Sequence, residues 1–421
     1  MSTRNDSARD LGAGAGSTRT AVDGPGDGVS GSGGTTVKEP ERCAELKGTA
    51  TTADTTATTD SATIISSSSS SSSSKSEGEG EGAGAGGHGH RRAAGDASGA
   101  AGVFRWAFDT AAWEPTQEEW TRAAQCVQPE EKERIGKFMF KEDAKLAIVG
   151  RLLLRKAASA MLAVPSSTLE LGRSKRNKPY VAKPVSSSSP AAAAASSKDV
   201  HVNVTHHGNF VLLASDPRYL CGVDVMQVDD LPGYVPSVDD FLKDFTRQFA
   251  SGEWETIMAQ STGPRRLEQF YRLWALKESF IKATGIGLLG DLRLLDFRQD
   301  ATEFNEAHSP AVVERGTRVS VAGRDAAHWR FHISYVDRSH VAAVAVGPAE
   351  DAVCAEAAGE DVITVAERVH DVLSDADERL RAVPFVHLSF GELISSLTPV
   401  PAHKVGSLAL TLLLSHSCAT P

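Results

Sequence analysis

A carboxylate in the middle of an apolar stretch is the first residue of this sequence that suggests chemistry. Asp224 interrupts the run Cys221 to Met226, CGVDVM, which otherwise has the composition of a buried strand. A buried carboxylate is costly unless it is paired, protonated or bound to a cation. A second carboxylate, Glu278, is its natural partner, because Mg²⁺ binds one or two carboxylates together with substrate phosphates and waters. Asp224 and Glu278 therefore predict a Mg²⁺ site.

Glu278 lies in the stretch Phe270 to Gly285, FYRLWALKESFIKATG, which is typical of a helix. Apolar residues recur on one side of it: Phe270, Leu273, Trp274 and Ile281. Gly285 is expected to end the helix, and Trp274 is expected to be core. Glu278 and Lys282 lie one turn apart on one side of this helix, and Lys277 is the residue before Glu278, on the adjoining side. An isolated pair of this kind is usually an exposed ion pair worth about 0.3–0.5 kcal/mol, so only Asp224 favours a site here.

The sequence G-V-D-V and the later W-A-L-K-E-S-F-I-K together resemble the paired signature of the Sfp-type 4′-phosphopantetheinyl transferases. Within that family the chain is most similar to the eukaryotic L-aminoadipate-semialdehyde dehydrogenase type. The resemblance covers about residues 103–346, interrupted by a low-complexity insertion at 185–197. It implies an α+β fold of two similar halves, residues 103–221 and 222–347, related by a pseudo-twofold axis. Coenzyme A would lie in the cleft between the halves.

The reaction that this resemblance implies is transfer of the 4′-phosphopantetheine arm of coenzyme A to a serine of an apo carrier protein. Adenosine 3′,5′-bisphosphate is released, and Mg²⁺ is required. By resemblance, the catalytic residues are Glu278 as the base, Lys282 and His206, and the Mg²⁺ ligands are Asp224 and Glu278. Many relatives have a second acid where this chain has Met226, so water or the substrate pyrophosphate would complete the coordination.

Coenzyme A has a 3′-phosphate and a pyrophosphate, which need several converging cationic and backbone donors. The basic loop Arg173 to Lys178 and the element N-V-T-H, which resembles the family's N-[VI]-S-H, would supply them. From this resemblance together with their donor groups, the expected coenzyme A contacts are Arg134, Arg173, Ser174, Lys175, Arg176, Lys178, Asn203, Thr205, His206, Lys277 and Lys282. Asn177 and His207 depart from the family pattern, with Asn in place of Gly and His in place of Gln. Arg151 is expected to be structural.

Composition limits how much of the 421 residues can fold. Residues 1 to about 102 are mostly Gly, Ser, Thr and Ala, so we expect them to be disordered. Residues 348–421 form an extension without an assigned role, expected to pack partly on the core. The first residues lack the apolar region of a secretory signal, whereas an organellar transit peptide stays open. Five scattered cysteines fit a reducing compartment, which favours the cytosol.

Two kinds of partner are disfavoured. The net charge of −10 argues against nucleic acid, although the basic loop alone could bind it. No apolar run reaches the ~18 residues needed to span a membrane. Two further alternatives remain. One is another Mg²⁺ phosphotransferase, although this sequence lacks the glycine-rich loop that such an enzyme would need. The other is a catalytically silent scaffold that binds carrier proteins. The carrier could belong to a fatty-acid, polyketide or peptide synthase or to aminoadipate reductase, and the resemblance favours a monomer.

Hydrophobic periodicity also predicts elements along the chain. The expected helices are residues 118–127, 143–162, 239–249, 253–258 and 270–284, with partial patterns at 361–373 and 388–397. The expected strands are residues 104–108, 210–214, 219–225, 292–297, 317–321, 329–335 and 340–346, of which the last four would close a second sheet.

Overall fold

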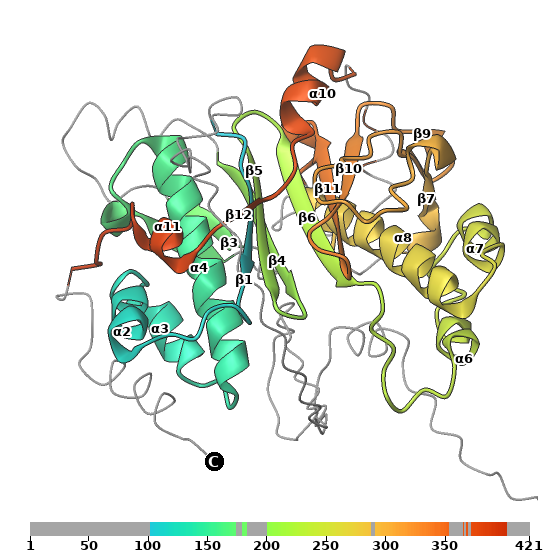
Figure 1. Ribbon diagram of the computed structural model, residues 1–421. Helices are drawn as coiled ribbons and strands as arrows, with labels where there is room; N and C mark the ends of the chain where they lie inside the picture. Colours follow the sequence, from blue (N-terminus) through green and yellow to red (C-terminus); the bar gives the residue numbers. More distant parts are fainter. Residues whose placement is uncertain are drawn as a thin grey trace, which may run out of the picture.

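The computed structural model describes residues 102–173, 179–182, 200–287, 291–352, 365, 368 and 372–401 (Figure 1). Three expectations fall outside this part of the chain: the disorder of residues 1–101, the contacts of the basic loop at 174–178, and the insertion at 185–197. Most of the helical pattern expected at 361–373 falls outside it as well.

The N-terminal half packs a helix against one face of a sheet. Its elements are β1 (Arg105–Asp109), α2 (Gln117–Gln125), α3 (Pro129–Ile135), α4 (Lys141–Leu162), β2 (Glu170–Arg173), β3 (Pro179–Ala182), β4 (His201–His207) and β5 (Phe210–Asp216). Strands β1, β5 and β4 pair antiparallel in that order. Helix α4 has 22 residues, and its apolar side packs on this sheet with α2 and α3 beside it. The helix expected at 143–162 is confirmed and starts two residues earlier.

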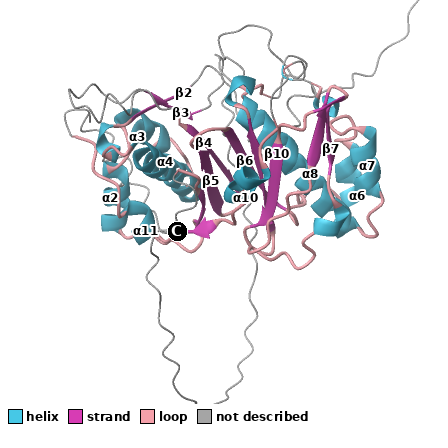
Figure 2. Ribbon diagram, turned by 90° about the horizontal axis from the view of Figure 1, so that it is seen from above, coloured by secondary structure: helices cyan, strands magenta, loops and turns pink. Residues whose placement is uncertain are grey.

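The C-terminal half is organised around a second 22-residue helix. Its elements are β6 (Leu220–Gln227), α6 (Val238–Lys243), α7 (Ser251–Met258), α8 (Gly263–Thr284), β7 (Leu295–Arg298), β8 (Arg318–Val321), β9 (Arg324–Asp325), β10 (Arg330–Tyr335) and β11 (His340–Gly347). Strands β10, β11 and β6 form one antiparallel sheet. Seen from above, α8 lies between this sheet and β7 (Figure 2). Each half thus pairs a long helix with a sheet, as the α+β expectation requires.

Helix α8 has both boundary signals that its sequence suggested. The Thr262 side chain accepts from the backbone N–H of Arg265 at the start, and Gly285 takes the left-handed conformation (φ 81°) at the end. Every residue from Leu267 to Ile281 is buried, so the helix is surrounded rather than packed along one stripe. Trp274 is core, as expected, with 1% of its surface exposed.

The expectation of a single second sheet was wrong. Residues 295–298 and 318–321 pair with each other as β7 and β8, and with β9 they form a separate three-stranded sheet. Only β10 and β11 join β6. The periodicity of a strand does not encode its partner, and here α8 separates the two groups (Figure 2). The helix expected at 239–249 is also shorter, because α6 ends at Lys243.

The two halves share a third core between their sheets. Side chains of β1 and β5 pack there against side chains of β6 and β11, and all are apolar and buried: Ala107, Phe210, Leu212, Ala214, Cys221, Val223, Val225, Ala342, Val344 and Val346. Strand β4 lies beside β6 where the sheets meet (Figure 1). The junction of the halves is therefore a packed interface.

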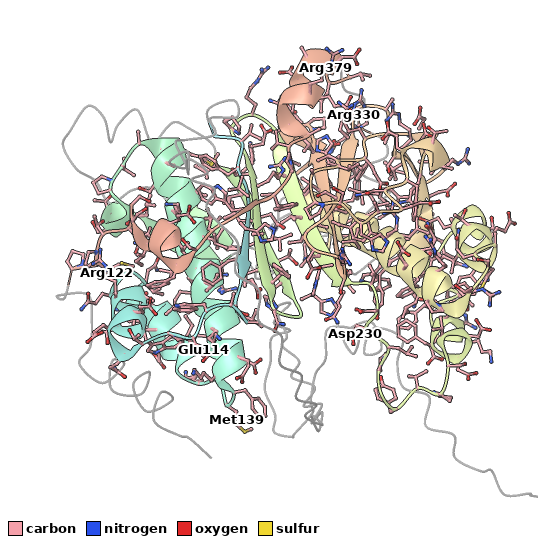
Figure 3. The ribbon with its side chains drawn as sticks, in the orientation of Figure 1. Glu114, Arg122, Met139, Asp230, Arg330 and Arg379 are labelled. Atoms are coloured by element: carbon pink, nitrogen blue, oxygen red, sulfur yellow. The ribbon has the colours of Figure 1, made fainter. Side chains whose placement is uncertain are left out.

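Residues 372–400, the C-terminal strap, are part of the fold. Helix α10 (Asp375–Arg381) anchors to both halves, since Arg381 pairs with buried Asp216 at 2.7 Å and Arg330 pairs with Glu378 at 3.1 Å beneath it (Figure 3). Strand β12 (Val386–His387) then adds to β1 in parallel. Helix α11 (Phe390–Ile394) packs near α4, where Phe390 stacks on Trp113 with ring centroids 4.9 Å apart. The extension thus contacts both halves.

Candidate active site

Three side chains from three elements meet at the junction of the halves. The Lys282 ammonium on α8 lies 2.5 Å from Asp224 Oδ1 on β6 and donates to Thr205 Oγ1 on β4 at 3.0 Å. The Thr205 hydroxyl donates to the same Asp224 oxygen, also at 3.0 Å. Asp224 is fully buried, whereas 24% of the Lys282 side chain is exposed. The buried carboxylate is thus compensated by a cation that reaches the surface.

Gly222 makes this contact possible. A Cβ at Gly222 would lie 2.0 Å from the Ser279 carbonyl oxygen and 2.5 Å from the Ala283 nitrogen, so the α8 backbone lies directly against β6. Residues 222 and 224 share a face of the strand. Asp224 therefore faces α8 one pleat further along, within reach of Lys282. Sequence reasoning gave Gly222 no role, although a glycine inside an apolar strand is itself a signal of close backbone approach.

Glu278 lies on α8 one turn before Lys282, and 6% of its surface is exposed. Met226, next to Asp224 on the same face of β6, is fully buried in the core of the C-terminal half. The donor set here is two carboxylates on neighbouring elements, and no group of three or more possible metal ligands exists among the described residues. Mg²⁺ is commonly held by one or two carboxylates with substrate phosphates. The residues present fit that requirement.

The predicted residues of β4 divide between two environments. Asn203 Oδ1 accepts from the Val223 backbone N–H at 3.0 Å, and Thr205 joins the Asp224 contact. Strand alternation places His206 on the other face, shared with Val204, which packs toward the core of the N-terminal half. The structure therefore brings Thr205 to Asp224 and places His206, partly exposed, on the far side of the strand.

Arg134 and Arg173, far apart in sequence, meet at one buried carboxylate. Glu131 lies 3.3 Å from each of them and 3.4 Å from Arg151. Burial opposes ionisation of Glu131, but the three guanidinium groups outweigh it and lower its pKa. Burial also opposes ionisation of Arg151, and for this cationic group it lowers the pKa, to about 10. One carboxylate with three guanidinium groups leaves an excess of positive charge at the start of the basic loop, which suits a phosphate.

Sequence reasoning missed Glu131, and Arg151 was expected only to be structural. The remaining members of the basic loop, Ser174, Lys175, Arg176 and Lys178, lie outside the described residues.

Lys277 is not brought to this site. Its ammonium lies 2.8 Å from Glu253, donates to the Leu292 carbonyl at 2.9 Å and also donates to the Leu295 carbonyl. These three acceptors match the three donors of an ammonium. Lys277 is 1% exposed, and burial lowers its pKa while raising that of Glu253. The sequence suggested a phosphate contact, but the side chain points into the core instead.

We therefore expect Lys277→Met to destabilise the fold by about 3–5 kcal/mol, because Glu253 would remain buried without its cation. Thermal unfolding measures this loss. Lys137→Met is the control, since the Lys137–Glu133 pair is exposed at both ends and is worth at most about 1 kcal/mol. A variant of normal stability with a raised KM for coenzyme A would instead restore Lys277 as a phosphate contact.

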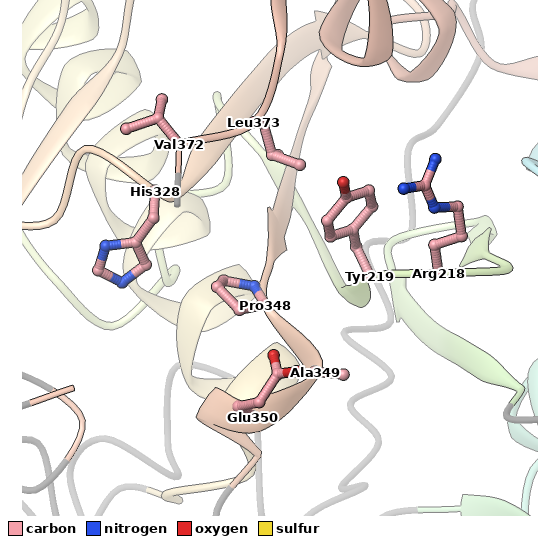
Figure 4. A pocket seen from close by; sticks show the side chains of 8 residues that line it. All are labelled: Arg218, Tyr219, His328, Pro348, Ala349, Glu350, Val372 and Leu373. Atoms are coloured by element: carbon pink, nitrogen blue, oxygen red, sulfur yellow. The ribbon is translucent and has the colours of Figure 1, made fainter. Parts of the chain in front are cut away.

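A cavity of about 340 Å³ lies elsewhere, at the end of β6 and β11 away from His207 (Figure 4). Its lining joins residues before β6, one residue before β10, residues after β11 and the start of the strap: Arg218, Tyr219, His328, Pro348, Ala349, Glu350, Val372 and Leu373. None of the predicted site residues that the structure describes lines it. Among the described residues, no helix is both long enough and apolar enough to cross a membrane.

The fold and the site define a two-lobed α+β protein with an aspartate–lysine contact at the junction of its lobes and an arginine cluster in the N-terminal lobe. Residues 111–218 match the family described as 4′-phosphopantetheinyl transferase, N-terminal. Residues 220–345 match the 4′-phosphopantetheinyl transferase superfamily. The chain belongs to this superfamily. It is an enzyme that transfers the phosphopantetheine arm of coenzyme A to carrier proteins.

Individual relatives agree. The chain is 35% identical over 296 residues to the L-aminoadipate-semialdehyde dehydrogenase-phosphopantetheinyl transferase of Homo sapiens, covering 70% of this chain and 86% of the relative. The Xenopus laevis protein of the same name is 36% identical over 288 residues, covering 67% and 88%. The 4′-phosphopantetheinyl transferase Sfp of Bacillus subtilis (strain 168) is 27% identical over 204 residues, covering 47% and 80%.

Proposed function

We propose that the transfer is Mg²⁺-dependent and takes place where Asp224, Lys282 and Thr205 meet, with Glu278 beside them. The observation that carries this proposal is the contact of Lys282 with both Asp224 and Thr205, at 2.5 and 3.0 Å. It joins one buried carboxylate, one hydroxyl and one partly exposed cation from both halves of the molecule. Substitution of Asp224, Thr205 or Lys282 would break this contact between groups that act on the same phosphate.

Each residue has a role that its chemistry supports. Glu278 takes the proton of the carrier serine as its oxygen bonds to the phosphorus that bears the pantetheine arm. The bond from that phosphorus to the oxygen of adenosine 3′,5′-bisphosphate breaks, and Lys282 donates to the phosphate oxygens where negative charge develops. Thr205 and Asp224 hold the Lys282 ammonium in place. Mg²⁺, held by Asp224 and Glu278, would supply positive charge beside the pyrophosphate.

Coenzyme A binding is assigned mainly to the N-terminal half. Arg134 and Arg173 stand at Glu131 with an excess of positive charge, which supports a contact with the 3′-phosphate or the pyrophosphate. Ser174, Lys175, Arg176 and Lys178 continue this basic surface by sequence. Asn203 and His206 remain proposed contacts from β4. Lys277 leaves the proposed set because its three donors are taken.

The carrier and the setting are also proposals. The names of the relatives point to the carrier domain of aminoadipate-semialdehyde dehydrogenase, and other acyl, polyketide and peptidyl carriers present the same serine chemistry. The matched ranges 111–218 and 220–345 support a division into halves near residue 221. A monomeric enzyme in the cytosol agrees with the internal pairing of the halves and the scattered cysteines.

Intact-mass spectrometry tests the reaction directly. The full chain would be incubated with coenzyme A, Mg²⁺ and an apo carrier protein, and the expected result is a gain of one phosphopantetheine arm that EDTA prevents and added Mg²⁺ restores. Competition among several carriers would rank the substrates. A gain that survives EDTA would overturn the proposed metal dependence. Bound coenzyme A without transfer to any carrier would indicate a silent scaffold.

A further inference from the structure

Strands β4 and β6 lie side by side as the facing edges of two different sheets (Figure 1). Strand β4 pairs with β5, and β6 pairs with β11. Among the described residues, no backbone hydrogen bond joins β4 to β6. Something other than a backbone ladder must therefore set the distance and register between the strand that carries Thr205 and the strand that carries Asp224.

Three β4 side chains, each two residues apart and thus on one face, contact β6. Asn203 Oδ1 accepts from the Val223 N–H at 3.0 Å, and His207 Nδ1 accepts from the Gln227 N–H at 2.8 Å. Between them, Thr205 donates to Asp224 at 3.0 Å. Asn203 and His207 thus use backbone donors on either side of Asp224. Asn203 is buried, so loss of its acceptor would leave the Val223 N–H unsatisfied.

We propose that Asn203 and His207 are positioning residues, which fix β6 against β4 and so hold Asp224 and Lys282 in the reacting geometry. The proposal rests on the roles proposed above for Asp224 and Lys282. It gives the amide oxygen of Asn203 a partner in the protein, in addition to any contact with coenzyme A. It also gives a function to His207.

The hydrogen bond fixes the tautomer of His207. Because a backbone N–H donates to Nδ1, that nitrogen carries no proton and the proton lies on Nε2. Nε2 is 3.5 Å from the Asp230 carboxylate, which lies beyond the end of β6 (Figure 3). The imidazole is therefore held from both sides, with the β6 backbone at one nitrogen and the loop after β6 at the other.

Three substitutions of His207 separate the two nitrogens. The Oδ1 of asparagine is three bonds from Cα, as is His Nδ1, whereas the Oε1 of glutamine is four bonds away, as is His Nε2. His207→Asn should keep the β6 contact and near-normal activity. His207→Gln and His207→Leu should lose it and lower kcat by about 10- to 100-fold, because small misplacements of reacting groups carry costs of this size. KM for coenzyme A should change little, because the arginine cluster is untouched.

Amide hydrogen exchange over residues 220–227 gives a readout that needs no turnover. Exchange should be faster in His207→Gln and His207→Leu than in wild type, and normal in His207→Asn. Asn203→Leu should also speed exchange, and combined with His207→Leu its effect on kcat should be less than multiplicative, because both act on one strand.

Either of two outcomes would overturn the proposal. One is unchanged kcat and unchanged exchange in His207→Gln and His207→Leu. The other is a loss confined to the KM for coenzyme A that asparagine does not restore, which would make His207 a substrate contact. If the leucine variant does not fold, the comparison of asparagine with glutamine still decides. If wild type proved inactive toward every carrier, the proposed function would fail while the exchange result would still test the contact itself.

Discussion

Glu278→Gln should reduce transfer by about 10³-fold or more, the range expected when a general base is removed, here with loss of a proposed metal ligand as well. The substitution removes charge with almost no change in volume, so the fold should persist. Single-turnover transfer followed by intact mass is the measurement, with circular dichroism and thermal unfolding to establish that the protein is folded. Glu255→Gln is the matched control, because Glu255 is an exposed glutamate on α7. It should behave as wild type.

The dependence of the transfer rate on Mg²⁺ concentration distinguishes the two proposed roles of Glu278, as a metal ligand and as a base. If Glu278 is a ligand, residual activity in Glu278→Gln should need a higher Mg²⁺ concentration for half-saturation than wild type does. If it is only a base, the Mg²⁺ dependence should be unchanged while the rate falls. Near-normal turnover at ordinary Mg²⁺ concentrations would refute both roles and shift attention to Asp224 and Lys282 alone.

Gly222→Ala should destabilise the protein by about 3 kcal/mol, at the upper end for overpacked positions. The added Cβ would meet backbone atoms of Ser279 and Ala283, which cannot turn away as a side chain can. Relief requires α8 to move off β6, and that movement would pull Lys282 from Asp224. Activity should therefore fall even at temperatures where the variant remains folded. Thermal unfolding and transfer assays, run on the same sample, measure the two effects.

Gly252→Ala is the control for the glycine substitution. Gly252 lies in the first turn of α7, and a Cβ there would have no neighbour within 4 Å. Replacing it should leave stability unchanged or raise it slightly, because alanine favours helix over glycine by up to about 1 kcal/mol. Equal behaviour of Gly222→Ala and Gly252→Ala would mean that the close approach of β6 and α8 is not required.

Local sequence was sufficient for the elements themselves. The continuous apolar run from Cys221 to Met226 placed Asp224 inside a strand, and the spacing of Phe270, Leu273 and Trp274 predicted α8 as a helix that ends at Gly285. Helical periodicity also placed Glu278 and Lys282 on one side. These features depend on residues within a few positions of each other, so a single sequence contains them. The pairing of strands and the course of the C-terminal strap depend on distant partners and could not be read in this way.

The case of Lys277 and Lys282 shows where that boundary lies. Both are lysines on α8, five residues apart, and the sequence assigned both to phosphate. Because α8 is buried on all sides from Leu267 to Ile281, its periodicity does not say which side carries the site. Only the tertiary structure decides that Lys277 faces Glu253 and the backbone carbonyls while Lys282 faces Asp224. The sequence determined the helix, the buried aspartate and the family. The packing of β6 and β4 against α8 decided which charged side chain of α8 meets Asp224.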